Sequence, residues 1–172
     1  MIRLLLGGTR SGKSGLGETL LAAGPAPHRV VATGRGLDFA LRRRIAAHKQ
    51  ARRPEVAVIE AGAEAMDVLA REAARGGTVL LDSLDFWLFA CHGQAGERQA
   101  DLARGLAPYR GPDGPELIIV SAETGLGPVA ADAATREFID DLGGLNQAAA
   151  ALADDVRLVA AGLHVQLKGN VA

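Results

Sequence analysis

The stretch Ile2-Arg-Leu-Leu-Leu-Gly-Gly-Thr-Arg-Ser-Gly-Lys-Ser14 decides the fold of this chain. It begins as an apolar strand, Ile2–Leu6, and runs directly into the pattern G-x-x-x-x-G-K-S. In such a loop, backbone N–H groups surround a phosphate chain, the lysine places a positive charge beside it, and the serine hydroxyl can bind Mg²⁺. A helix that starts here also directs its N-terminus, which favours anions, at the same phosphates. The stretch predicts a nucleotide site made of Gly7, Gly8, Thr9, Arg10, Ser11, Gly12, Lys13 and Ser14.

The composition excludes several classes of protein. The 172 residues suffice for one domain with a sizeable core, and a net charge of −1 with 3% aromatic residues argues against a nucleic-acid surface. No run of about 18 apolar residues exists, so no membrane span is expected. The single cysteine, Cys91, cannot form an internal disulfide, and the chain starts directly in the strand and phosphate loop, without a secretory segment. We therefore expect a cytoplasmic protein.

Short apolar runs alternate with helical patterns along the chain. Strands are expected at Ile2–Leu6, Arg29–Thr33, Val56–Glu60, Thr78–Asp82, Leu117–Ser121, Val156–Ala160 and His164–Lys168. Helices are expected at Lys13–Ala23, Asp38–Ala51, Ala63–Arg75, Glu97–Leu106 and Asp132–Leu152. This alternation, with the phosphate loop, predicts an α/β fold of the P-loop NTPase type (RecA-like), in which helices flank a mostly parallel central sheet within one domain, residues 1–172. The break at Gly162 predicts a C-terminal antiparallel hairpin at the edge of the sheet.

An acidic residue ends one of the expected strands. Asp82 closes the apolar run Thr78–Asp82, and ligands of parallel sheets collect at the carboxyl ends of the strands. In nucleoside-triphosphate enzymes, an acid placed there holds Mg²⁺ opposite the serine of the phosphate loop. Two readings therefore stay open for Asp82: a metal-side role with Ser14, or an N-cap of the segment Leu84–Ala90.

The segment from Asp38 to Arg53 is strongly basic and contains one histidine. On a helix, Arg44, His48 and Arg52 would form one stripe, because they follow one another at intervals of four residues. Neighbouring guanidinium groups favour the neutral imidazole, which is a nucleophile, and they neutralise phosphate charge. One interpretation is that His48 attacks a nucleotide phosphorus. The alternatives are a solvated basic helix with an incidental histidine, and a nucleic-acid patch, which the rest of the chain does not support.

Other segments carry weaker indications. The glycines of Ser121-Ala-Glu-Thr-Gly-Leu-Gly127 indicate that backbone approaches a ligand or forms a mobile lid. Trp87 and the neighbouring Phe86 and Phe89 are most simply core residues. Apolar residues at helical spacing in the last helix also favour a core role; they are Phe138, Ile139, Leu142, Leu145 and Leu152. His28, His92 and His164 lack matching partners and are interpreted as structural or surface residues.

An ordered series of motifs runs through almost the whole chain. It consists of Gly7-Gly-Thr-Arg-Ser-Gly-Lys-Ser14 with Glu18, Ala32-Thr33, Asp38, Arg44-Ile-Ala-Ala-His48, Glu60, Leu81-Asp82-Ser-Leu with Trp87, Ile119-Val-Ser-Ala-Glu123, Gly125, Gly127, Arg136-x-Phe138-x-Asp140, Gly143, Asn146-Gln147 and Val159-x-x-Gly162. In this order, the motifs resemble those of the bifunctional adenosylcobinamide kinase / adenosylcobinamide-phosphate guanylyltransferase family of cobalamin biosynthesis.

The resemblance implies two reactions. A nucleoside triphosphate, ATP or GTP, phosphorylates the hydroxyl of adenosylcobinamide; GTP then transfers GMP to a histidine, and the corrinoid phosphate takes up that GMP to give adenosylcobinamide-GDP. By position, the resemblance implies that His48 is the guanylylated residue, that Lys13 and Asp82 act with it, and that Ser14 and Asp82 hold Mg²⁺. The guanine nucleotide is expected near Ala32, Thr33, Gly34, Lys49 and Glu60. The resemblance also implies a homo-oligomer, while the composition predicts no nucleic-acid partner and no membrane span.

The chain departs from the family pattern where polar residues have become alanine. Ala40 replaces a glutamate, and Ala90 and Ala122 replace asparagines; Val56 stands for a tryptophan, and the segment after Gly127 begins Pro128-Val. Each donor or acceptor lost from a closed site can cost about 1–3 kcal/mol. Two alternatives to the bifunctional enzyme therefore stay open. One is a relative that retains only the kinase reaction, and the other is a nucleotide-binding paralogue without catalysis.

Overall fold

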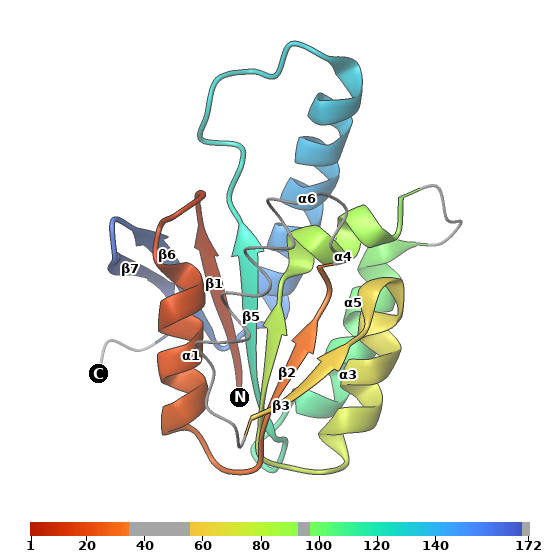
Figure 1. Ribbon diagram of the computed structural model, residues 1–172, viewed down its shortest axis with the longest axis vertical. Coiled ribbons are helices and arrows are strands. Elements are labelled where there is room, and N and C mark those ends of the chain that lie inside the picture. Colours follow the sequence, from red (N-terminus) through yellow and green to blue (C-terminus); the bar gives the residue numbers. More distant parts are fainter. Residues whose placement is uncertain (35–55, 93–96, 170–172) are drawn as a thin grey trace.

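A seven-stranded sheet forms the centre of the computed structural model, which describes residues 1–34, 56–92 and 97–169 (Figure 1). Its strands are β1 (Ile2–Gly7), β2 (His28–Ala32), β3 (Ala57–Glu60), β4 (Thr78–Asp82), β5 (Glu116–Ala122), β6 (Asp155–Ala160) and β7 (Leu163–Lys168). Their order in the sheet is β3-β2-β4-β5-β1-β6-β7. Neighbouring strands pair in parallel except for β6 and β7, which form an antiparallel hairpin.

Helices cover both faces of this sheet (Figure 1). The helix α1 (Lys13–Ala23) lies on one face. The other face carries α3 (Ala65–Ala73), α4 (Leu84–Ala90), α5 (Arg98–Leu106) and α6 (Ala133–Leu152), with the short 3₁₀ helices η1 (Gly62–Glu64) and η2 (Ala107–Tyr109). No helix in the described part of the chain is long and apolar enough to cross a bilayer.

The core is divided by the sheet into two apolar clusters. Leu5, Leu80 and Val120 point to the α1 face and pack with Leu21 of that helix. The larger cluster lies on the opposite face, where Leu4 and Ile119 of the central strands meet α3, α4, α5 and α6. The continuous Val, Ile and Leu runs of the sequence follow from this arrangement, because a strand covered on both faces buries every residue.

The fold predicted from the sequence is confirmed, including the edge hairpin at the C-terminal end. The bounds of α1 and β4 match the expected ones. Each of the other strands differs from its expected range by one residue at one or both ends. The expected helix Ala63–Arg75 is shorter, because it begins as η1 and continues as α3. The expected helix Asp38–Ala51 lies outside the described residues.

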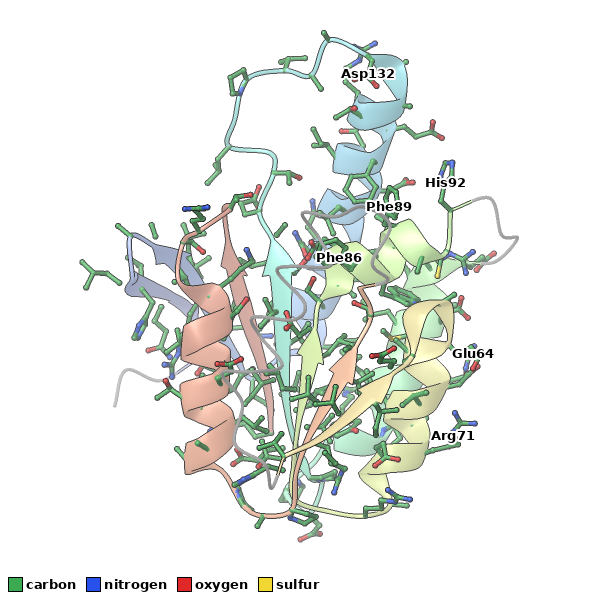
Figure 2. All side chains as sticks on the ribbon, viewed as in Figure 1. Glu64, Arg71, Phe86, Phe89, His92 and Asp132 are labelled. Atoms are coloured by element: carbon green, nitrogen blue, oxygen red, sulfur yellow. The ribbon has the colours of Figure 1, made fainter. Side chains whose placement is uncertain are left out.

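The core assignment of Phe89 is wrong. Its side chain is 51% exposed, whereas Trp87 is 1% exposed and donates its indole N–H to the carbonyl of Ala63 (3.0 Å). On this helix of seven residues, Leu84, Trp87 and Leu88 are buried in the larger apolar cluster, whereas Phe89 lies outside it (Figure 2). There it meets Phe138 of α6 edge to face, with ring centroids 6.4 Å apart.

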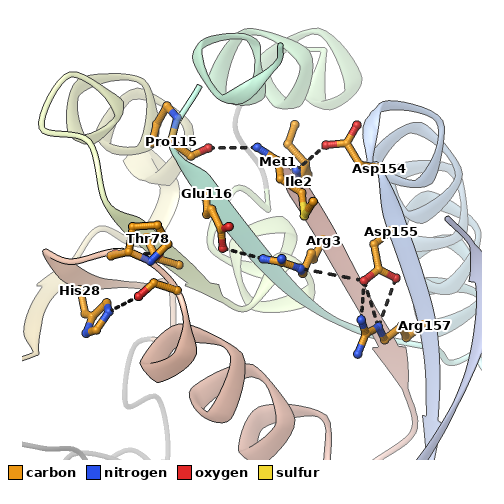
Figure 3. Close-up of polar contacts among 12 residues, drawn as sticks. Met1, Ile2, Arg3, His28, Thr78, Pro115, Glu116, Asp154, Asp155 and Arg157 are labelled. Carbon is orange, nitrogen blue, oxygen red and sulfur yellow. Dashed lines mark hydrogen bonds and ion pairs between the residues drawn. The ribbon is translucent and has the colours of Figure 1, made fainter. Parts of the chain in front are cut away.

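Charged side chains join the central strands near their amino ends (Figure 3). Arg3 of β1 donates to Glu116 of β5 (2.6 Å), and its Nε lies 4.0 Å from a carboxylate oxygen of Asp155 in β6. Arg157 completes the row with a 2.7 Å contact to Asp155. These ion pairs lie toward the amino ends of the strands, whereas the phosphate loop follows the carboxyl end of β1.

Candidate active site

The phosphate loop connects β1 to α1 with two residues in left-handed conformation. Arg10 has φ 58°, and Gly12 has φ 100° and is the N-cap residue of α1. Because glycine has no side chain, no side-chain group caps the N-terminus of this helix, and the first turn contains no acidic residue. The first amides of α1 therefore lack the acceptor that a capping side chain would supply, which suits an external anion.

Neighbouring strands hold the loop from two sides. The amide of Glu123, which follows β5, donates to the carbonyl of Gly7 (3.1 Å). On the other side, the amide of Gly162 in the β6–β7 turn donates to the carbonyl of Ser11 (2.8 Å). A hydrogen bond from the Ser11 amide to the Gly8 carbonyl (3.2 Å) closes the loop internally. The loop is thus supported by the sheet itself.

Lys13 and Ser14 begin the helix that follows the loop. Lys13 is only 7% exposed, and its Nζ donates to the carbonyl of Gly8 (3.1 Å), so the ammonium reaches back over the loop. Ser14 is half-buried beside it. A buried cation next to a helix N-terminus that has no side-chain cap is the donor set that a polyphosphate needs.

Asp82 ends β4 at the same edge of the sheet as the phosphate loop. One strand, β5, separates it from β1, and the register aligns Asp82 with Val120 of β5 and Val120 with Leu5 of β1. The N-cap of α4 is Ser83, so the alternative that Asp82 caps this helix is wrong. The carboxylate is half-buried, at the position that acids on the metal side occupy in nucleoside-triphosphate enzymes.

The residues expected near the guanine nucleotide follow the next two strands. Ala32 aligns with Asp82 on one side and with Glu60 of β3 on the other, so the three share one row across the sheet. Glu60 is exposed there, and Gly34 follows half-buried. Thr33 is 1% exposed: its Oγ1 donates to the Ser83 carbonyl (2.7 Å) and accepts from the Ser83 amide (2.8 Å). Thr33 therefore joins the ends of β2 and β4.

A polar network lies at the end of β5 and contains Asn146, which belongs to the motif series, and Asp85, which does not. Asn146 of α6 is 6% exposed; its Nδ2 donates to the carbonyl of Ala122 (3.0 Å), and its Oδ1 accepts from Ser121 Oγ (2.6 Å). Asp85 of α4 accepts from the amide of Ala122 (3.1 Å). The network fixes the end of β5, from which Glu123 reaches the phosphate loop. The sequence signal for Asp85 was its place in the first turn after the Asp82 strand.

His48 and Lys49 lie outside the described residues, together with the rest of the basic segment. Their predicted roles therefore stay predictions. Cys91, another group that could act as a nucleophile, packs against Ala63 in the larger apolar cluster. Burial raises the pKa of its thiol, against the opposing effect of Arg98, so it is held in the less reactive neutral form.

The charged residues of the site suit a divalent cation that is bound mainly through phosphate. No group of three His, Cys, Asp or Glu side chains that could hold a metal occurs within residues 1–34, 56–92 and 97–169. Mg²⁺ needs no such cage, since it is commonly bound by one or two protein oxygens together with substrate phosphates and water. Ser14 and Asp82 offer a hydroxyl and a carboxylate of this kind. Asp82 ends β4, and Ser14 lies in the first turn of α1, after the loop that follows β1; β4 and β1 flank β5 in the sheet.

Comparison with protein families gives one match that spans nearly the whole chain. The model of the family described as "Cobinamide kinase / cobinamide phosphate guanyltransferase" matches residues 3–167. The "Bifunctional adenosylcobalamin biosynthesis protein CobP" of Pseudomonas aeruginosa is 37% identical over 174 residues, which cover 97% of either chain. The "Bifunctional adenosylcobalamin biosynthesis protein CobU" of Salmonella typhimurium is 32% identical over 98% of this chain and 100% of that protein.

Solved structures are similar to this chain at the level of the fold. An ATPase from the type III secretion system of pathogenic bacteria aligns with a TM-score of 0.56 and 13% identity over 96% of this chain; the chain spans only 56% of that structure. The flagellar accessory protein FlaH from Methanocaldococcus jannaschii aligns with a TM-score of 0.53 and 12% identity over 98% of this chain and 78% of that one. These likenesses confirm the P-loop NTPase fold.

Proposed function

This chain belongs to the cobinamide kinase / cobinamide phosphate guanyltransferase family of transferases, and we propose that it carries out both family reactions in the biosynthesis of adenosylcobalamin. The observation that carries the proposal is the phosphate loop, in which an uncapped helix N-terminus and the buried Lys13 converge. The sequence relatives do not favour the alternatives of a kinase alone or of a paralogue without catalysis.

In the first reaction, the hydroxyl of adenosylcobinamide attacks the γ-phosphorus of ATP or GTP. A new P–O bond forms on the corrinoid, the bond to the β-phosphate breaks, and the hydroxyl proton is released. The chain's contribution is to hold the triphosphate: the amides at the start of α1 and the Lys13 ammonium neutralise charge on it. The hydrogen bond from the Glu123 amide to the Gly7 carbonyl keeps the loop that carries these donors in place beforehand.

In the second reaction, a histidine attacks the α-phosphorus of GTP and releases pyrophosphate. We assign this role to His48, from its place in Arg44-Ile-Ala-Ala-His48. The corrinoid phosphate then attacks the same phosphorus, forms the diphosphate bond of adenosylcobinamide-GDP and displaces the imidazole. Imidazole suits the step because it is both a nucleophile and a leaving group.

The cofactors follow from the same donor set. When bound, Mg²⁺ neutralises the polyphosphate, and Ser14 and Asp82 are the residues that would hold it. Ala32, Thr33, Gly34, Lys49 and Glu60 are proposed to surround the guanine nucleotide. Thr33 would act by its backbone, because its hydroxyl is engaged with Ser83. We also propose a homo-oligomer in the cytoplasm, and light scattering after size-exclusion chromatography would test the oligomer.

Incubation with GTP and Mg²⁺ tests the covalent step. We expect the protein to gain the mass of one guanylyl group, in an adduct that acid removes, because the P–N bond of phosphohistidine is acid-labile. The His48→Ala variant should gain nothing. His92 is an exposed histidine outside the site, so the His92→Ala variant should be labelled like the unchanged protein. An adduct of equal yield on His48→Ala would refute the assignment.

A further inference from the structure

The β6–β7 turn lies against the phosphate loop, although it belongs to the edge of the sheet. We propose that this turn, residues 160–163, is a positioning element of the nucleotide site: the Gly162 amide orients the Ser11–Gly12 peptide so that the Gly12 N–H faces the phosphates. The inference rests on the proposed function, in that the loop must bind a nucleotide. It gives a role to the motif Val159-x-x-Gly162, which no step of the two reactions uses.

The turn has a conformation that few residues tolerate. Ala160 pairs with Leu163, so two residues join the strands, and both have positive φ: 52° at Ala161 and 79° at Gly162. Positive φ at both central positions is typical of a type I′ turn, the hairpin turn that matches the twist of the strands. Glycine adopts this conformation freely, whereas alanine at the same angles is sterically disfavoured. The turn therefore depends on the identity of residue 162.

The contact between turn and loop is close. The Gly162 N–H donates to the Ser11 carbonyl at 2.8 Å. A Cβ placed on Gly12 would lie 3.1 Å from the Cα of Gly162, so the two glycines face each other across the contact. Beside them, a Cβ on Gly7 would collide with the carbonyl oxygen of Val159, the last core residue of β6. The backbone of the phosphate loop thus packs closely against the backbone of the β6–β7 hairpin.

The consequence for the ligand follows from the geometry of the peptide bond. In a planar trans peptide, C=O and N–H point in opposite directions, and the Ser11–Gly12 bond is trans. A hydrogen bond that holds the Ser11 oxygen against the hairpin therefore directs the Gly12 N–H away from it. Gly12 is the N-cap of α1, so this N–H joins the amides at the start of the helix. Release of the contact would let the peptide rotate and would weaken binding of the triphosphate.

The variant Gly162→Ala tests the proposal, with Gly76→Ala as its matched control. Both glycines have positive φ (79° and 65°), and a Cβ on either would meet nothing within 4 Å. Both variants therefore carry a similar backbone penalty, but Gly76 lies after α3, far along the chain from the loop contacts. We expect Gly162→Ala to raise the Kd of a non-hydrolysable GTP analogue about tenfold, the effect of one lost charge-assisted hydrogen bond. Gly76→Ala should bind like the unchanged protein, with a similar shift in Tm.

Two further measurements distinguish a role of the turn in positioning the phosphate loop from a general loss of stability. Asparagine tolerates positive φ better than alanine does, so Gly162→Asn should recover most of the affinity although its side chain is larger. In turnover, Gly162→Ala should raise KM for GTP and leave kcat within about twofold, because binding changes and the reacting groups do not. If Gly162→Ala fails to fold, Gly162→Asn decides. A Kd close to that of the unchanged protein supports the proposal, and a Kd raised about tenfold at an unchanged Tm overturns it, because the affinity would then not depend on the backbone conformation of the turn.

Nucleotide affinities distinguish the positioning role of the turn from the proposed function of the protein. Equal affinities of the unchanged protein, Gly162→Ala and Gly76→Ala would overturn the positioning role and leave the proposed function intact. Equal losses in the two alanine variants would also overturn it, because they would reflect stability alone. An unchanged protein that binds no guanine or adenine nucleotide would overturn the proposed function, and the positioning role with it.

Discussion

The two sides on which the phosphate loop is held differ in their depth within the fold. On the β5 side, Glu123 reaches the Gly7 carbonyl from a strand end that Asn146, 6% exposed, fixes by two hydrogen bonds. On the hairpin side, Gly162 reaches the Ser11 carbonyl from an exposed turn, and β7 beyond it has apolar side chains that are 58–76% exposed: Leu163, Val165 and Leu167.

This contrast indicates which substitutions should alter nucleotide binding without a large loss of stability. The β5 side is central in the sheet and pairs with β1 and β4, so a change there alters stability and site together. In the hairpin, β7 pairs with β6 alone among the described strands, so a change in its turn can alter the loop while the core stays intact. The variants below test this contrast.

Gly7→Ala should have the largest effect, because Gly7 lies between the two sides. Its carbonyl accepts from Glu123, and a new Cβ would collide with the Val159 carbonyl and lie 2.6 Å from Ser11 Oγ. We expect loss of nucleotide affinity by about a hundredfold and of stability by about 1–3 kcal/mol. Titration calorimetry and urea unfolding measure the two.

The matched control for this variant is Gly15→Ala. A Cβ on Gly15 meets nothing within 4 Å, and alanine is a better helix former than glycine by about 1 kcal/mol. The control should bind like the unchanged protein and unfold at the same or higher urea concentration. Normal nucleotide affinity of Gly7→Ala would show that the loop tolerates a displacement at its contact with the hairpin. It would contradict the expectation that both sides must hold the loop for binding.

Asn146→Ala tests the β5 side. It removes the side chain that bonds the Ser121 hydroxyl and the Ala122 carbonyl. We expect the free energy of unfolding to fall by about 3 kcal/mol. Gln147→Ala, at the exposed neighbouring position, should change stability by less than about 0.5 kcal/mol. Equal urea midpoints for the two variants would mean that the network does not fix the end of β5.

Thr33→Val tests whether the end of β2 is structural. The Thr33 hydroxyl both donates to and accepts from the Ser83 backbone. Valine leaves the buried Ser83 amide without this acceptor, whereas the Ser83 carbonyl still accepts from the amide of Trp87 (3.0 Å). We expect a loss of about 2 kcal/mol in urea unfolding. Thr33→Ser keeps the hydroxyl and should lose much less. A Thr33→Val protein of normal stability would instead indicate that the hydroxyl serves the ligand.

Alkaline pH should lower the stability of the protein through Tyr109, its only tyrosine. We expect this effect to be smaller than those of the substitutions above. Burial raises its pKa, while Arg29 opposes the rise, and its hydroxyl donates to the Leu69 carbonyl (2.9 Å). The folded chain thus keeps a proton that the unfolded chain loses above about pH 10, so stability is complete below that pH and falls above it by about 1.4 kcal/mol per pH unit.

Urea unfolding at several alkaline pH values measures this dependence, and Tyr109→Phe should reduce its slope. The absorbance of tyrosinate gives an independent readout, because no other tyrosine contributes. Nucleotide affinity of Tyr109→Phe at neutral pH should equal that of the unchanged protein, since Tyr109 ends η2, away from both sides of the loop. A tyrosine that ionises near pH 10 in the folded protein would contradict the prediction.

Much of the fold could be predicted because its signals are local. The Val and Leu run of Thr78–Asp82 and the glycine-rich start of α1 fix the bounds of those elements through burial and backbone geometry. Phe89 shows the limit: its neighbours Leu88 and Trp87 are as apolar, and only the direction in which α4 packs decides that Phe89 is exposed.

The sequence alone determined a phosphate-binding loop, the α/β class and the resemblance to a family, because these depend on residue types at short spacing. Only the tertiary structure decided which residues surround the loop, because that depends on strand order. Placing β1 between β5 and β6 brings two distant residues to the same loop: Glu123, 116 residues beyond Gly7 in the chain, and Gly162, 151 residues beyond Ser11. No local pattern contains that information, since the contacts are made by backbone amides.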